Sequence, residues 1–279
     1  MLLLLGCQDH LFTLDGKRDS PEDTAADSGG RVDSGRTDPW PEDSGETPTD
    51  DSGADTDTEE PRTDCESILV YSTAGTRGAN TGLFDGLETD PTLARWDVDV
   101  KERVSAGELT AASLVGRSQL WILGTDPDAG TTLGMSEVLV VRDFVDKGGG
   151  LLLAGGAAGS DSYAEDVNLL SELYGVGFDG SYREGSDGAP VTVEDADRAL
   201  IPRVSSVPGF ASVAELDVTD PAVNAAFNLG GGPSMAWWED GARVVFDRTW
   251  GGWQDAFRNV GDQSALVLDV AAFLEPCPG

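Results

Sequence analysis

Seven polar side chains stand just after apolar runs of the sequence, and their chemistry could define a site. They are Ser72, Asn80, Asp126, Asp128, Ser160, Asp161 and Asp247. If the apolar runs are parallel strands, their carboxyl ends meet at one edge of a sheet, where ligands bind in open α/β folds. Converging carboxylates there could hold Ca²⁺ or Mg²⁺, or act as an acid and base pair. Loop aspartates more often cap helices and turns, and in a chain this acidic some gather by chance, so we expect no metal and no cofactor.

Two tryptophans offer a different chemistry. Trp250 and Trp253 lie in a glycine-rich stretch directly after the last apolar run. Exposed indole rings beside Asp and Gln are suited to stacking on sugars or to gripping a protein. A structural role is the alternative for both residues. For the preceding pair, Trp237 and Trp238, we favour a core or covering role for at least one.

The strongest pattern is an amphipathic helix followed by a buried strand. Apolar residues recur at helical spacing from Val138 to Val145, Ser136 can cap the start of this helix, and Gly148–Gly150 end it. Leu151–Ala154 is apolar throughout and predicts an inner parallel strand whose two faces are both covered by helices.

The remaining elements alternate between strand and helix. Strands are expected at Ile68–Ser72, Trp96–Val100, Leu120–Gly124 and Val244–Asp247, and helices through Phe84 and Leu87 and at Ala106–Leu114, Tyr163–Tyr174 and Gln263–Leu274. Residues 176–235 are poorly periodic and predict loop excursions or an antiparallel extension. This order predicts an α/β fold, a flavodoxin-like three-layer sandwich with a mostly parallel central sheet.

The first 64 residues differ from the rest of the chain. Residues 8–64 repeat Asp-Ser-Gly and hold too little apolar surface to offset chain entropy, so we expect a disordered acidic tether. Residues 1–7, MLLLLGC, resemble the end of a bacterial lipoprotein signal, in which the cysteine is lipidated and becomes the mature N-terminus. The stretch lacks a basic region and is shorter than a signal peptide. We expect a truncated signal with lipidation at Cys7, and a chance leucine run is the alternative.

Two further cysteines bracket the predicted folded domain, residues 65–279. Cys65 precedes the first strand and Cys277 follows the last helix. In a doubly wound sheet the first strand begins at the edge where an antiparallel closing helix ends, so the two sulfurs should be neighbours. We expect a disulfide, which suits an exported protein, and two free thiols are the alternative.

Most of residues 66–275 resemble class I glutamine amidotransferase-like domains, and in particular a non-catalytic or uncharacterised branch found in exported bacterial proteins. The segments that carry the resemblance are Leu120–Gly124, Phe144–Gly156, Asn168–Leu170, Tyr174–Val176, Ala242–Asp247 and Leu266–Leu274. In catalytic members, the strand that matches Leu151–Ala154 ends in a tight turn carrying a cysteine, which His and Glu side chains activate.

This chain departs from the family at the reacting groups. Gly155 and Gly156 stand at the turn, and the only histidine, His10, lies in the tether. Without a thiol or an imidazole, the amidotransferase reaction has no nucleophile and no base. Ser160 likewise has no histidine to activate it. Glycine suits such a turn because it accepts positive φ.

Charge narrows the partners. The formal net charge of −33, from 51 acidic and 18 basic residues, excludes nucleic acid. The sequence predicts a lipid-anchored, extracytoplasmic protein of the bacterial cell envelope. It is bound to the membrane through its lipid and presents a catalytically silent amidotransferase-like domain to a glycan or an envelope protein. One alternative is a carboxylate- or metal-dependent envelope hydrolase acting on carbohydrate, and another is a structural surface protein with an empty crevice.

Overall fold

The computed structural model describes residues 65–72, 83–102, 107–124, 133–155, 162–182, 188–210, 213–229 and 232–275. Predictions for Cys7, the tether, Asn80, Asp126, Asp128, Gly156, Ser160, Asp161 and Cys277 fall outside these residues. Within them, no helix is both long enough and apolar enough to cross a bilayer.

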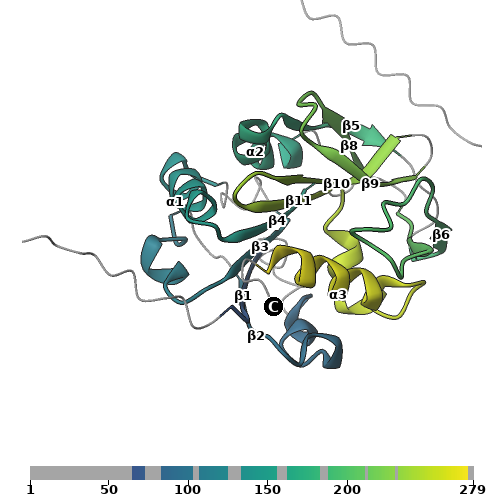
Figure 1. The fold of residues 1–279 in the computed structure, drawn as a ribbon, viewed down its shortest axis with the longest axis horizontal. Coiled ribbons are helices and arrows are strands. Elements are labelled where there is room, and N and C mark those ends of the chain that lie inside the picture. Colours follow the sequence, from purple (N-terminus) through teal and green to yellow (C-terminus); the bar gives the residue numbers. More distant parts are fainter. Residues whose placement is uncertain are drawn as a thin grey trace, which may run out of the picture. The chain divides into compact units, whose positions relative to one another are not determined.

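A seven-stranded sheet forms the centre of the domain, in the order β2-β1-β3-β4-β11-β10-β9 (Figure 1). The strands in that order are β2 Asp97–Glu102, β1 Ser67–Ser72, β3 Gln119–Leu123, β4 Gly150–Ala154, β11 Arg243–Asp247, β10 Gly232–Glu239 and β9 Asn224–Leu229. The first five are parallel to one another, and β10 is antiparallel to both of its neighbours, β11 and β9. Strand β4 is buried along its whole length between β3 and β11, so the predicted mostly parallel α/β sheet is confirmed.

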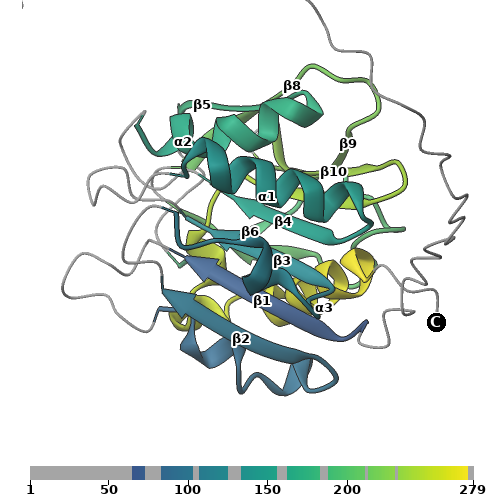
Figure 2. The same ribbon diagram turned by 90° about the vertical axis from the view of Figure 1, so that its left-hand side faces the viewer.

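Helices cover both faces of the sheet. Helices α1, Met135–Asp146, and α2, Ser162–Ser171, pack on one face, and α3, Gln263–Leu274, packs on the other (Figure 2). Alternate residues of β4 point to the two layers, Leu151 and Leu153 toward α1 and Leu152 toward α3. This arrangement explains the uninterrupted apolar run of the strand, because neither of its faces meets water.

For residues 176–235 the sequence predicted either loop excursions or an antiparallel extension, and the described part of this range forms antiparallel strands. Strand β5, Val176–Tyr182, pairs with β8, Val213–Val218, and the short strands β6, Pro190–Thr192, and β7, Ser206–Pro208, pair with each other. Strands β9 and β10 extend the central sheet. The weak periodicity of this region reflects short strands with irregular register, and β5 and β10 both contain register shifts.

Two of the predicted helices are wrong. Ala106–Leu114 contains only a short 3₁₀ turn, Ala111–Leu114, because Gly107 has a φ of 83° and Thr110 and Ser113 cap each other. The helix predicted through Phe84 and Leu87 is a pair of 3₁₀ turns, Asp85–Leu87 and Pro91–Leu93. In both segments, buried leucines anchor the turns to the core without the length that a stable α-helix needs.

Smaller differences concern helix ends and faces. Helix α1 begins after Gly134 rather than at a Ser136 cap, because the Glu137 carboxylate accepts the Gly134 N–H at 2.9 Å. After α2, Leu173 is 51 % exposed although helical spacing puts it on the same face as the buried Val167 and Leu170, and Tyr174 is buried instead. The change from α to 3₁₀ geometry at Glu172–Tyr174 rotates the following side chains and accounts for this exchange.

One buried ion pair joins the 3₁₀ turns to the segment before α3. Asp90 lies 2.5 Å from an Nη atom of Arg258, and both side chains are nearly inaccessible to water. Asp90 also accepts the Thr92 N–H at 2.8 Å. Burial lowers the pKa of Arg258, and the charge of Asp90 acts in the opposite direction. The pair therefore compensates a charge that the fold would otherwise bury alone.

Replacing Asp90 by Ala should lower the free energy of unfolding by about 3 kcal/mol, because it leaves the buried Arg258 cation with only the more distant and more exposed carboxylate of Asp255. Urea unfolding measures this change. The matched control is Asp146→Ala, which breaks the exposed pair with Arg142 and should change the same quantity by less than about 0.5 kcal/mol. Equal effects of the two substitutions would contradict the role assigned to Asp90.

Candidate functional site

The carboxyl ends of the parallel strands meet at one edge of the sheet. Leu123 of β3 is in register with Ala154 of β4, and Ala154 with Asp247 of β11. The structure therefore brings together Ser72, Gly155 and Asp247 from the predicted set, and places Trp250 and Trp253 in the segment after β11. These five residues are the described part of the candidate site.

The hydroxyl of Ser72 is committed to the backbone of the neighbouring strand. Its Oγ donates to the carbonyl of Leu123 at 2.5 Å, and the residue is buried. This contact ties the end of β1 to the end of β3. Ser72 therefore serves the sheet rather than an open crevice.

Gly155 occupies the turn where the catalytic relatives would carry a cysteine. Its N–H donates to the carbonyl of Asp247 at 3.0 Å. A Cβ at this position would lie 3.0 Å from the ring of Phe178 and 3.2 Å from Val167. The φ of Gly155 is not in the left-handed region, so the expectation of positive φ is wrong at this residue. Glycine is needed here because neighbouring side chains approach the backbone closely.

Phe178 is held against Gly155 by Asn168 of α2. The Asn168 amide donates to the carbonyl of Phe178 at 2.8 Å and accepts its N–H at 2.7 Å. This pair of hydrogen bonds fixes the backbone of β5 against α2 at Phe178. A side chain at residue 155 would therefore require the buried Phe178 ring to shift.

Asp247 and Trp253 form one buried unit. One carboxylate oxygen of Asp247 accepts the indole N–H of Trp253 at 2.8 Å, and the other accepts the Thr249 N–H at 3.0 Å. Trp253 is 0 % exposed and packs edge-on against Trp121, with ring centroids 5.5 Å apart. The prediction that Trp253 is an exposed ring for stacking on sugars is therefore wrong. Its ring fills the core under α3, and its N–H compensates a buried charge.

The other tryptophans have different environments. Trp250 is partly exposed and contacts Phe84 at 6.2 Å between ring centroids, so it remains a candidate contact residue. Trp237 packs on Phe273 and donates to Asp197 at 3.1 Å. Trp238 packs on Tyr174 on the opposite face of β10. The covering role predicted for this second pair is confirmed.

The sequence reasoning missed two buried charged residues at the same edge. Glu137 accepts the N–H groups of Gly134 and Leu109, at 2.9 and 3.1 Å, and the hydroxyl of Tyr71 at 3.4 Å. Arg248 follows β11 and donates to the carbonyl of Leu229 at 3.3 Å. Glu137 could have been found from its position three residues after the helix cap, where a glutamate reaches back to the cap N–H. A buried arginine directly after a strand has no comparable signal.

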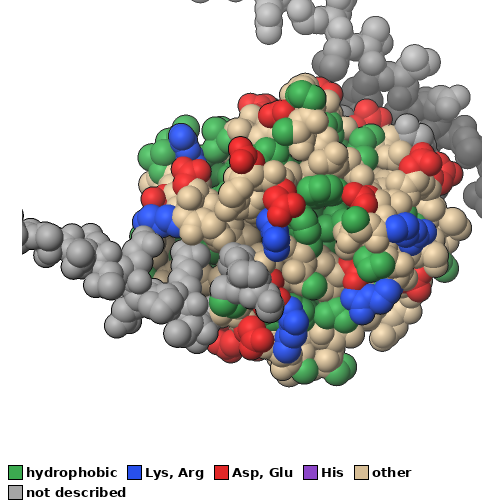
Figure 3. Space-filling model, viewed as in Figure 1, with side chains coloured by type: hydrophobic (Ala, Val, Ile, Leu, Met, Phe, Trp, Pro, Cys, Tyr) green, Lys and Arg blue, Asp and Glu red, His purple; other side chains and the backbone are tan. Residues whose placement is uncertain are grey.

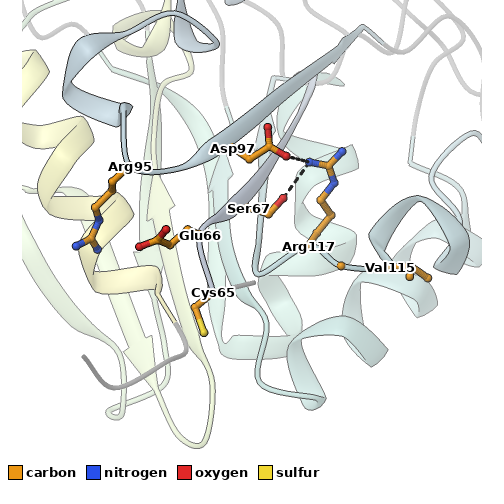
Figure 4. Close-up of a pocket in the computed structure, with 8 residues that line it drawn as sticks. Cys65, Glu66, Ser67, Arg95, Asp97, Val115 and Arg117 are labelled. Carbon is orange, nitrogen blue, oxygen red and sulfur yellow. Dashed lines mark hydrogen bonds and ion pairs between the residues drawn. The ribbon is translucent and has the colours of Figure 1, made fainter. Parts of the chain in front are cut away.

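A large hollow lies at the opposite, amino edge of the sheet (Figure 4). It has a volume of about 770 Å³ and is lined by Cys65, Glu66, Ser67, Arg95, Asp97, Val115, Gly116 and Arg117. Arg117 is paired with Asp99 and Asp97, and Arg95 with Glu275. The cations that line this hollow are therefore already compensated by carboxylates.

The described residues contain no cluster of three or more His, Cys, Asp or Glu side chains that could hold a metal ion. The face of the molecule shown in Figure 3 has acidic and basic side chains interspersed, with apolar ones between them. Convergence of Asp126 and Asp161 on Asp247 would favour a carboxylate- or metal-dependent hydrolase. Asp126 and Asp161 lie outside the described part of the chain.

Comparisons with known proteins identify the fold. No family model matches the chain, and no curated protein matches it. Among solved structures, the N-terminal domain of mmIFT52 is 18 % identical, with a TM-score of 0.56, over 72 % of this chain and 94 % of that one. The cytoplasmic protein STM1381 of Salmonella typhimurium LT2 is 15 % identical, with a TM-score of 0.55, over 75 % and 99 %.

A ThuA-like protein of Bacteroides uniformis is 16 % identical, with a TM-score of 0.52, over 73 % of this chain and 89 % of that one. At these identities the likeness concerns the fold alone. The domain thus has the fold of ThuA-like proteins, which is the class I glutamine amidotransferase-like fold that the sequence resembled.

Proposed function

We propose that the protein is a lipid-anchored component of the bacterial cell envelope whose amidotransferase-like domain binds a ligand or partner and does not catalyse amide transfer. The observation that carries this proposal is the turn after β4. Gly155 carries no reactive group, and a side chain there would crowd Phe178 and Val167, so the position that matches the family's nucleophile has none.

The position of Cys65 supports the same conclusion. Cys65 precedes β1, at the amino edge of the sheet, while the turn after β4 lies at the carboxyl edge. The chain has no histidine in residues 65–279 that could activate a thiol or a hydroxyl. Binding is therefore the role left to this edge by the residues that are present.

The rival proposal is a carboxylate-dependent hydrolase acting on carbohydrate. Among the site residues that the sequence predicted and the structure describes, Asp247 carries the carboxylate that could act as an acid or base in this reaction. This residue is buried and bound to Trp253 and Thr249, which suits a structural charge better than a proton-transfer group. A hydrolase reaction would thus depend on the carboxylates of Asp126 and Asp161.

Glycan binding can be tested at Trp250, the partly exposed ring after β11. Titration of the protein with soluble cell-wall glycan fragments should change its tryptophan fluorescence, and Trp250→Phe should reduce that change at least about 3-fold. Trp238→Phe is the matched control, because this ring packs against Tyr174 on the far side of the sheet. It should leave the titration unaltered.

Two results would contradict the binding proposal. The first is release of ammonia from glutamine by the purified protein. The second is release of reducing sugar from the same fragments that Asp247→Asn abolishes without changing the melting temperature. Either result would make the domain an enzyme. An unchanged fluorescence signal with every fragment would remove glycan as the ligand and favour an envelope protein.

Membrane attachment through Cys7 is tested by intact-mass measurement of protein extracted from bacterial membranes, with a lipoprotein export signal fused in front of Cys7. We expect a mass increase that corresponds to lipid on the mature N-terminal cysteine. Cys7→Ser should move the protein to the soluble extracytoplasmic fraction, because one lipid anchor supplies the membrane affinity. An unmodified Cys7 would contradict this part of the proposal.

The Cys65–Cys277 disulfide is part of the same proposal. Arg95 lines the hollow beside Cys65 (Figure 4). It pairs with Glu275. Arg243 donates to the carbonyls of Phe273 and Glu275, at 2.9 and 2.8 Å, and so fixes the end of α3. Only one residue separates Glu275 from Cys277, and two residue steps span at most about 7 Å, which keeps Cys277 within reach of this edge.

In a Cys7→Ser variant, thiol titration under denaturing conditions should find no free thiol before reduction and two after it. Cys277→Ser should lower the free energy of unfolding by up to about 5 kcal/mol, because the lost cross-link closes a very long loop. Two reactive thiols in the unreduced, exported protein would show that the cysteines are free and would remove the support they give to export.

A further inference from the structure

A small cavity lies beside Asp247 at the carboxyl end of β11. Its volume is about 20 Å³. Its walls are largely apolar, from β7, β9 and α3, and four polar residues also line it: Ser234, Asp247, Thr249 and Gln263. About 10–15 Å³ of such space accommodates one water molecule, provided that two to four polar partners surround it.

Two of these polar side chains have a buried atom with no partner in the protein. They are the Oγ of Ser234 and the Nε2 of Gln263, on residues that are 2 % and 1 % exposed. Ser234 reaches the cavity from β10 and Gln263 from the first residue of α3. A buried donor without an acceptor is costly, and two around one cavity point to an occupant that both of them bind.

The third side chain supplies the acceptor. Asp247 already accepts N–H groups from Trp253 and Thr249, and a carboxylate has lone pairs for further donors. An anion in the cavity would be repelled by this charge, and a metal cation would face the N–H group of Gln263. A molecule that accepts from the amide and donates to the carboxylate satisfies both groups.

We propose that one water molecule is a permanent part of this domain, bound between Gln263, Ser234 and Asp247. The water accepts the Gln263 N–H, exchanges a hydrogen bond with the Ser234 hydroxyl and donates to the Asp247 carboxylate. It joins β10, β11 and α3 beside the buried charge of Asp247. This inference stands whether or not the domain binds a glycan.

The deciding measurement is a water-to-protein nuclear Overhauser experiment on the isotope-labelled, full-length protein. The side-chain amide of Gln263 should show a cross-peak with the sign and intensity of a water that resides longer than the rotation of the molecule. Absence of that cross-peak in the wild-type protein would overturn the proposal, and this outcome does not depend on any variant folding.

Variants give a second, independent readout. Ser234→Ala and Gln263→Met should each lower the melting temperature by about 3 °C, and the double variant by less than the sum, because the water is lost in each case. In a dry cavity both substitutions would remove an unpaired polar group and would leave the temperature unchanged or raise it. Ser136→Ala, on the exposed face of α1, is the control and should cause no loss.

Gly252→Ala separates the two cases by the sign of its effect. The new Cβ would lie 3.4 Å from the Nε2 of Gln263, and the φ of Gly252 is not left-handed, so the methyl group takes the space of the water without backbone strain. With a water present, it should remove the cross-peak and lower the melting temperature by about 3 °C. A higher melting temperature, as expected for filling an empty cavity, would overturn the proposal.

Discussion

The buried carboxylate of Asp247 constrains much of the structure on the α3 side of the sheet. A charge removed from water needs donors, and Trp253 and Thr249 supply two of them. Trp253 can donate only if the segment after β11 folds back under α3. Arg258 holds that segment by donating to the carbonyl of Trp253 at 3.2 Å, and Arg258 in turn requires Asp90. One carboxylate at a strand end thus accounts for a chain of buried polar contacts.

The opposite face of the sheet has a comparable arrangement around Glu137. Its carboxylate joins the end of β1, the turn before residue 111 and the start of α1 through three donors. Glu137 and Asp247 are both buried near the carboxyl edge, one in each layer. In an open α/β fold this edge is where ligands bind, yet here both carboxylates are occupied by backbone and side-chain donors of the protein itself. The carboxylates of Glu137 and Asp247 therefore stabilise the loops at this edge.

The sequence predicted those parts of the fold that depend on periodicity. Burial on one or two faces dictates the residue types of an element, so such elements can be recognised from the sequence. They are the apolar strands β1, β3, β4 and β11 and the amphipathic helices α1 and α3. The helix predicted at Ala106–Leu114 is wrong because local capping by Thr110 overrides a short apolar pattern. The roles of Gly155 and Trp253 could not be predicted, since they depend on Phe178 and Asp247, which are distant in sequence and become neighbours only in the folded chain.

The same constraints bear on what the domain could recognise. The described hydrogen bonds of Ser72, Asp247 and Trp253 run to other groups of the protein, so the proposed binding role rests on Trp250 and on the sequence that follows β1, β3 and β4. Residues 73–82, 125–132 and 156–161 contain Gly, Ala, Ser, Thr, Asn, Asp, one Pro and one Arg, and no aromatic or large aliphatic residue. Such residues bind through hydrogen bonds rather than through burial of apolar area. This composition supports the proposal of a hydroxyl-rich ligand such as a glycan over an apolar peptide.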